Sequence, residues 1–201
     1  MVPELQVRPL LIPCPGDALA ADLALPAAAR ALVLFAHGSG SGRRSPRNGA
    51  VAAHLQRLGL ATLLLDLRPG AQTLLAAVDW IAWQPELAPL PLGLFGASSG
   101  AAAALEVAAQ RPERVRALVS RGGRPDLASA ALGLVRCPTL LIVGGEDRAV
   151  LELNAWAAER LRCPHELLVV PGAGHLFAEA GALEAVAAAS GTWFDRQLCR
   201  R

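Results

Sequence analysis

The segment Gly96-Ala97-Ser98-Ser99-Gly100 constrains the fold of this chain more than any other part of its sequence. An uncharged run with strand character precedes it from Leu92, and an alanine-rich run follows it to Leu105. A Gly-x-Ser-x-Gly segment between a strand and a helix forms a sharp turn, and its glycines leave room for a strained serine that stands above the sheet. Ser98 is therefore a candidate nucleophile. The alternative interpretation is a strand, a turn and a helix that the serines only cap.

Composition limits both the architecture and the chemistry. The chain has 201 residues, of which 53% are hydrophobic, and this predicts one compact α/β domain over residues 1–201. The net charge is +2, with acids and bases interspersed, so we expect neither nucleic acid nor a membrane surface as a partner. All 19 basic residues are arginine, and tyrosine is absent. Schiff-base catalysis, a P-loop lysine and a Tyr-Lys reductase pair are therefore excluded.

Three further sequence features bear on the cellular location of the protein. Residues 1–9 contain proline and charge where a signal peptide would have an apolar core, so we expect a cytoplasmic protein. The four cysteines lack CxxC spacing and are interpreted as reduced structural thiols. Residues 87–105 carry no charge and are long enough to suggest a membrane span. Prolines, glycines and serines divide this stretch, which predicts two elements of a soluble core instead.

Strand and helix patterns alternate along the chain. Segments near residues 10–12 and 18–25 predict an opening antiparallel pair. Apolar runs predict further strands at 31–36, 61–65, 92–95, 115–119, 139–143 and 166–170. Helices are predicted at about 48–58, 73–83, from the Ser98 turn to Arg111, at 150–161 and at 180–198. This alternation predicts a doubly wound, mostly parallel sheet, and the short stretch 120–136 leaves little chain for a cap domain.

Polar residues follow several of the predicted strands. Because the carboxyl ends of parallel strands meet at one edge of a sheet, we expect the loop 37–42, Ser98, Asp147 and His175 to lie together. A serine hydroxyl needs a base within reach and a carboxylate to orient that base. Serine, acid and histidine in this chain order form a known nucleophile, acid and base arrangement. The sequence therefore predicts a site of Ser98, Asp147 and His175.

Each partner of Ser98 has an alternative. Glu146 and Asp147 are both candidates for the acid, and we favour Asp147 because its shorter side chain suits its place before the next helix. The alternative role of Asp147 is only to cap that helix. Among the histidines, His54 lies within an amphipathic helix and His165 opens a strand. His37 begins a glycine loop that it could orient. Only His175 lies late in the chain, on a glycine-flanked loop after the last strand.

A tetrahedral intermediate at Ser98 would need two backbone donors. The amide of Ser99 is expected to be one. The second is expected from the loop 37–40, with Ser39 preferred to Gly40. This loop does not match a dinucleotide fingerprint or a P-loop. No set of His, Cys, Asp and Glu has the spacing of metal ligands. We therefore expect neither a metal nor another cofactor.

Arginines follow two of the predicted strands and have two interpretations. They would favour a carboxylate- or phosphate-bearing substrate if they surround the site, or they form a solvated basic rim. The arginines concerned are Arg43, Arg44, Arg47, Arg121 and Arg124.

Four segments carry a resemblance to a known family: 34–40 (LFAHGSG), 96–102 (GASSGAA), 141–147 (LIVGGED) and 172–177 (GAGHLF). They resemble the α/β-hydrolase superfamily, in particular its dienelactone-hydrolase-like branch. The resemblance implies an eight-stranded sheet and a triad of Ser98, Asp147 and His175 that hydrolyses carboxylic esters or lactones. The chain departs from the branch by having Ser98 where dienelactone hydrolases carry cysteine. Its segment after Asp66 is also short, so one pocket wall is expected to be missing.

Together these features predict a cofactor-free serine hydrolase that acts on a small ester, thioester or lactone. An acyltransferase or perhydrolase would use the same acyl-enzyme. A binding protein with an α/β-hydrolase fold and no activity is the alternative from another class. The sequence leaves a homo-oligomer open.

Overall fold

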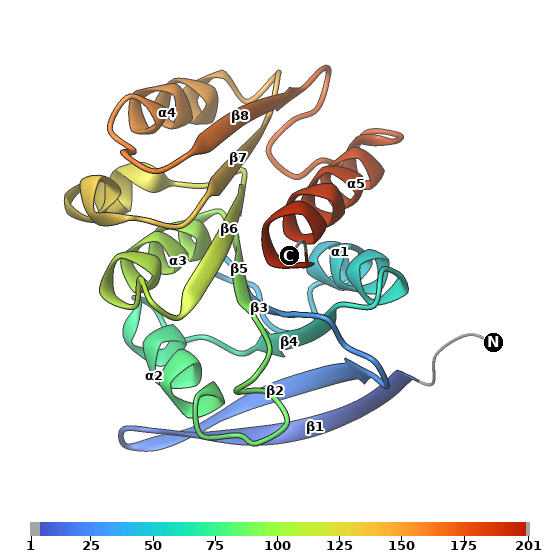
Figure 1. The fold of residues 1–201 in the computed structure, drawn as a ribbon. Coiled ribbons are helices and arrows are strands. Elements are labelled where there is room, and N and C mark those ends of the chain that lie inside the picture. Colours follow the sequence, from blue (N-terminus) through green and yellow to red (C-terminus); the bar gives the residue numbers. More distant parts are fainter. Residues whose placement is uncertain (1–4, 200–201) are drawn as a thin grey trace.

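The computed structural model describes residues 5–199, in which strands and helices alternate along most of the chain (Figure 1). The strands are β1 (Leu5–Cys14), β2 (Asp17–Pro26), β3 (Leu32–Ala36), β4 (Ala61–Leu65), β5 (Leu92–Ala97), β6 (Val115–Arg121), β7 (Thr139–Gly144) and β8 (His165–Val170). The helices are α1 (Pro46–Arg57), α2 (Gln72–Ile81), α3 (Ser99–Gln110), α4 (Arg148–Ala158) and α5 (Ala182–Phe194). A 3₁₀ segment, η1 (Pro125–Leu134), precedes β7, and a π-helical segment, η2 (Asp195–Cys199), follows α5.

The strands form one eight-stranded sheet in the order β1-β2-β4-β3-β5-β6-β7-β8. β1 and β2 are antiparallel to each other, and β2 is antiparallel to β4. All the other neighbours are parallel. The opening antiparallel pair and the mostly parallel, doubly wound sheet are therefore confirmed.

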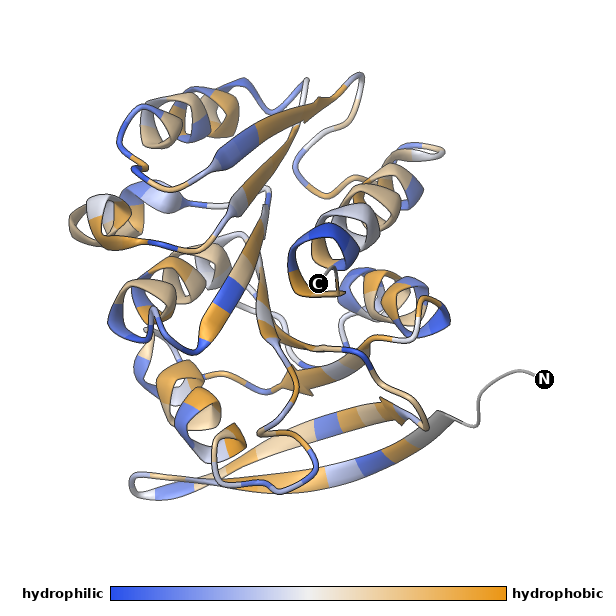
Figure 2. Ribbon diagram, viewed as in Figure 1, coloured by the Kyte–Doolittle hydropathy of each residue, from blue (hydrophilic) through white to orange (hydrophobic). Residues whose placement is uncertain are grey.

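Helices cover both faces of this sheet. α1 and α5 pack on one face, where Val51, Leu55 and Val186 join the strand residues Val33 and Phe95 in one buried cluster. α2, α3, α4 and η1 pack on the other face over a second cluster, and Figure 1 shows the two layers on either side of the strands. The central strands are hydrophobic along most of their length (Figure 2), because both of their faces lie against helices.

The uncharged stretch 87–105 divides into β5 and α3, as expected. Across residues 5–199, the helices are too short or too polar for any of them to cross a membrane. Between β6 and β7 the chain forms only η1, and no cap domain is inserted there. The carboxyl edge of the sheet is therefore bordered by loops.

Candidate active site

Ser98 lies on a strained turn between β5 and α3. Its φ of 53° and ψ of −123° place a non-glycine residue in a region that L-amino acids rarely adopt. A Cβ added at Gly96 would lie 2.5 Å from Ala101 Cα, and one added at Gly100 would lie 2.3 Å from the Ala36 carbonyl oxygen. The Ser98 amide donates to the Arg121 carbonyl at 3.1 Å, which ties the turn to β6. Close packing and the sheet thus hold the strained conformation.

His175 and Asp147 come from two loops and meet in a hydrogen bond. His175 lies after β8, and its Nδ1–H donates to Asp147 Oδ2 at 2.6 Å. Asp147 occupies the N-cap position of α4, yet its side chain makes no capping hydrogen bond. The side chain of Asp147 is 15% exposed and that of His175 is 40% exposed. The Asp147 carboxylate therefore orients an imidazole that solvent can reach. The Asp147 side chain does not cap α4.

The neighbours of His175 connect it to the Ser98 turn. A Cβ added at Gly122 would lie 3.5 Å from His175 Cε1, so the imidazole packs against the end of β6. Gly122 follows Arg121, whose carbonyl accepts from the Ser98 amide. Glu146, the competing acid, is exposed. The structure thus brings Asp147 to His175, beside the strand end that holds Ser98.

His37 fixes the loop that packs on the other side of Ser98. The Leu67 amide donates to His37 Nε2 at 2.8 Å, so this nitrogen carries no proton, and Nδ1–H donates to the Gly38 carbonyl at 2.9 Å. A Cβ at Gly38 would lie 3.0 Å from Ser98 Cβ. His37 therefore orients the glycine loop, which is the role that the sequence suggested for this histidine.

Ser39 and Ser99 contact each other across this loop. The Ser39 amide donates to Ser99 Oγ at 2.9 Å, and the two hydroxyl oxygens are 3.0 Å apart. The amide expected to stabilise an oxyanion is thus bonded to a side chain in this structure. The Ser99 amide opens α3, where the first N–H groups of a helix have no acceptor within the helix. Gly40 follows Ser39 with a φ of 73°.

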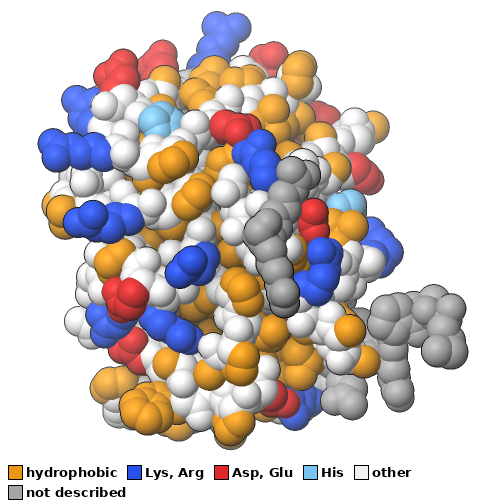
Figure 3. Space-filling view, viewed as in Figure 1, with side chains coloured by type: hydrophobic (Ala, Val, Ile, Leu, Met, Phe, Trp, Pro, Cys, Tyr) orange, Lys and Arg blue, Asp and Glu red, His pale blue; other side chains and the backbone are white. Residues whose placement is uncertain are grey.

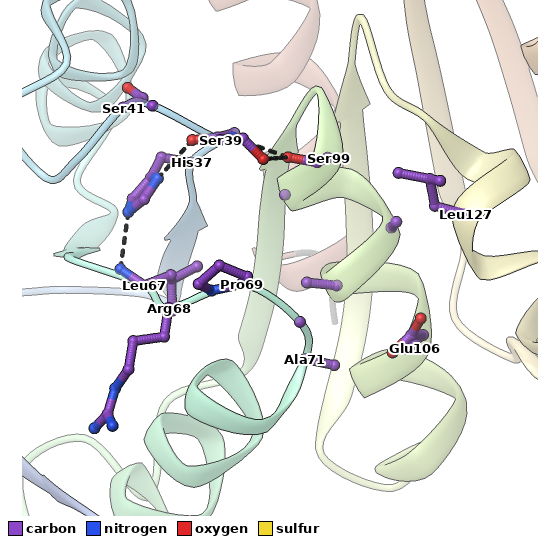
Figure 4. A pocket seen from close by; sticks show the side chains of 16 residues that line it. His37, Ser39, Ser41, Leu67, Arg68, Pro69, Ala71, Ser99, Glu106 and Leu127 are labelled. Carbon is purple, nitrogen blue, oxygen red and sulfur yellow. Dashed lines mark hydrogen bonds between the residues drawn. The ribbon is translucent and has the colours of Figure 1, made fainter. Parts of the chain in front are cut away.

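A cavity of about 370 Å³ adjoins Ser39 and Ser99 (Figure 4). Residues 67–71 form one of its walls, so the wall that the short segment was expected to lack is present. Leu127 of η1 lines the opposite side. Two charged residues that sequence analysis missed, Arg68 and Glu106, also line the cavity. A signal for Glu106 existed, because it is the only charged residue of α3.

The structure does not bring Arg43, Arg44 or Arg121 to this cavity. Arg43 forms ion pairs with Asp22 and Asp66. Arg44 is exposed.

Arg121 is buried, and its guanidinium lies 5.7 Å from the Phe177 ring centroid. Burial, with a smaller contribution from Arg47, lowers the pKa of Arg121 to about 10. Arg124 forms an ion pair with Asp126. Neither these arginines nor Ser98 and His175 line the cavity, so contact of the arginines with an anionic substrate stays a prediction beside the alternative of a solvated rim.

The remaining polar features are dispersed. Across residues 5–199, no group of three or more His, Cys, Asp and Glu side chains is placed to hold a metal ion. The four cysteines are free, and burial, together with the neighbouring Cys163, raises the pKa of the Cys137 thiol to about 12. On the face in Figure 3, acidic and basic side chains are interspersed.

The chain is similar to a known protein family and to solved structures over most of its length. The sequence model of the "Dienelactone hydrolase family" matches residues 56–198. A crystal structure of dienelactone hydrolase from Anabaena variabilis is 46% identical, covers 96% of this chain and 99% of that chain, and superposes with a TM-score of 0.94. Est1E from Butyrivibrio proteoclasticus is 19% identical, with 94% of this chain and 98% of that chain covered and a TM-score of 0.83, and it shares the α/β-hydrolase fold.

A curated relative from Mycobacterium tuberculosis is named "Putative phosphoribosyl transferase". It is 50% identical over an alignment 196 positions long, which covers 90% of this chain and 44% of the relative. The chain thus spans less than half the length of this relative.

Proposed function

Because the chain belongs to the dienelactone hydrolase family, we propose that it cleaves a small carboxylic ester, thioester or lactone through an acyl-enzyme on Ser98. The family and the esterases among the structural neighbours support a hydrolase. The observation that carries the finer proposal is the hydrogen bond from His175 to Asp147 beside the strained turn at Ser98. The name of the mycobacterial relative is not transferred, since this chain matches only 44% of that protein.

In the proposed first step, Ser98 Oγ attacks the carbonyl carbon and gives its proton to His175 Nε2. The attack converts the carbonyl oxygen to an oxyanion and leaves a tetrahedral carbon bonded to Oγ. Asp147 accepts the Nδ1–H bond, so it keeps Nε2 free as the base and stabilises the imidazolium that forms. The exposed side of His175 is consistent with this transfer, because the base must reach a bound substrate.

The oxyanion would be stabilised at the start of α3. The Ser99 amide is the first donor, and the positive end of the helix dipole favours negative charge at the same place. Ser39 is proposed as the second donor, with Gly40 as the alternative. Because the Ser39 amide is bonded to Ser99 Oγ, that hydroxyl would rotate away when the oxyanion forms. A single donor of this kind contributes roughly 10²- to 10³-fold in kcat.

Collapse of the intermediate expels the leaving group. The bond from carbon to the alcohol or thiol breaks, and His175 returns the proton to the departing atom. A water molecule then attacks the acyl carbon, with His175 again accepting the proton. The bond from the acyl carbon to Ser98 Oγ then breaks, His175 returns the proton to Oγ, and the carboxylic acid leaves.

A screen of nitrophenyl esters of increasing acyl length tests this proposal. We expect hydrolysis by the wild-type chain and a loss of about 10⁴-fold or more in kcat for Ser98→Ala. Mass spectrometry of the products should find the free acid. Equal rates for the wild type and Ser98→Ala would contradict the proposal. Transfer of the acyl group to an added alcohol or to hydrogen peroxide, without free acid, would instead indicate the acyltransferase or perhydrolase.

A further inference from the structure

The floor of the cavity is one face of α3. Ser99, Ala102, Ala103 and Glu106 all line it, and positions three, four and seven residues apart share a helix face. At 1.5 Å per residue, Glu106 lies about 10 Å along the helix from Ser99. The cavity therefore starts at the proposed oxyanion donor and leads along α3 to a carboxylate.

Glu106 is accessible from more than one side. It also lines two neighbouring hollows of about 340 and 800 Å³, so its half-buried side chain lies where three cavities adjoin. Across residues 5–199, no arginine forms an ion pair with Glu106. Its carboxylate is thus free to meet a ligand.

Arg68 does not compensate for this charge. Figure 4 shows its side chain extending away from both Ser99 and Glu106. Its Nη2 lies 4.0 Å from Asp17 Oδ2, at the turn between β1 and β2. Negative charge therefore prevails at the Glu106 end of the cavity.

The other walls of the cavity are mostly apolar. Leu67, Pro69 and Leu127 face the alanines of α3 across it. A hydrocarbon chain placed there would cover the side of Glu106 that faces this cavity and remove part of the water from its carboxylate, which is unfavourable without a partner. A cationic group at the end of the chain would pair with the carboxylate and offset this cost.

We propose that this cavity binds a substrate chain that ends in a primary ammonium group, and that Glu106 recognises the ammonium. The inference rests on the proposed function, because reaction at Ser98 fixes the position of the ester. The spacing along α3 sets the ammonium about 10 Å from the ester carbonyl. The substrate class is thus an ester of an amino acid or amino alcohol whose amine is far from the carbonyl.

Paired ester series of increasing chain length test the inference, each chain ending either in an ammonium or in a methyl group. At the matching length, we expect kcat/KM for the ammonium ester to exceed that of its methyl counterpart by about tenfold or more. Glu106→Gln should bring the ratio of the two kcat/KM values to about one, and added salt should reduce the ratio in the wild type. Glu113→Gln is the matched control, because Glu113 is exposed beyond the far end of α3 and should leave both rates unchanged. Equal rates within the wild-type pairs would overturn the inference.

Binding without turnover separates this inference from the proposed function. Calorimetry should show that hexylammonium binds the wild-type chain more tightly than hexanol does, and that Glu106→Gln loses the difference. If no ester is cleaved but this difference remains, the proposed function fails and the ammonium site stands. If esters are cleaved but hexylammonium and hexanol bind equally, the ammonium site alone is wrong.

Discussion

Two adjacent acids, Glu146 and Asp147, follow β7, and the structure separates them. Only Asp147 contacts His175, whereas Glu146 is exposed. The choice between them could be made from the sequence because side-chain length and the nearby start of α4 limit which acid can turn toward the site. The hydrogen bond at 2.6 Å agrees with that choice.

Asp147→Asn should therefore lower kcat by about 10⁴-fold, since the amide NH2 can donate to His175 Nδ1 and leave the proton on Nε2, where the base is needed. Glu146→Gln should cost far less. Steady-state kinetics on one nitrophenyl ester would check both variants, and thermal unfolding would confirm that both are folded. The opposite ranking of the two variants would move the orienting role to Glu146.

The arginines show what the sequence could not predict at the scale of residues. Their positions after two strands allowed two interpretations, a charged ring around the site or a solvated basic rim. Arg43 instead binds Asp22 of β2 and Asp66 beyond β4, two acids that are distant from it in the chain. Pairing between such distant segments depends on strand order, which spacing along the chain does not reveal.

At the scale of elements, the turn between β5 and α3 depends on its glycines. β5 extends two residues beyond the predicted 92–95, because Gly96 pairs with Ala36 on one side and Ser120 on the other. An apolar pattern cannot indicate this, since a glycine within a strand gives no hydrophobic signal. The strand at 61–65 has the predicted limits because an apolar run there ends at a charged residue.

Gly100→Ala should destabilise the chain by about 1–3 kcal/mol or more and remove the proposed esterase activity, because its Cβ would meet backbone at Ala36 and His37. Gly49→Ala is the matched control in α1, where an added Cβ meets nothing within 4 Å. That variant should gain about 0.5–1 kcal/mol from better helix propensity. Urea unfolding would measure both changes. Wild-type stability and activity in Gly100→Ala would contradict the packing described for the turn.

At the scale of the molecule, the parallel sheet made much of the candidate site predictable. The carboxyl ends of β3, β5, β7 and β8 precede the glycine loop, Ser98, Asp147 and His175 in turn, and they share one edge. The cavity was not predictable in the same way. Its walls come from residues 67–71, α3 and η1, and only their packing decides that Glu106 lines a hollow.

The proposed acyl-enzyme on Ser98 requires that this serine be far more reactive than the other serines of the chain. Labelling with a fluorophosphonate, followed by peptide mass spectrometry across the whole chain, measures this directly. We predict an adduct on Ser98 that is lost in Ser98→Ala and kept in Ser99→Ala, because Ser99 is proposed to act through its backbone amide. An adduct on Ser99, or no adduct on any serine of the folded protein, would contradict the account.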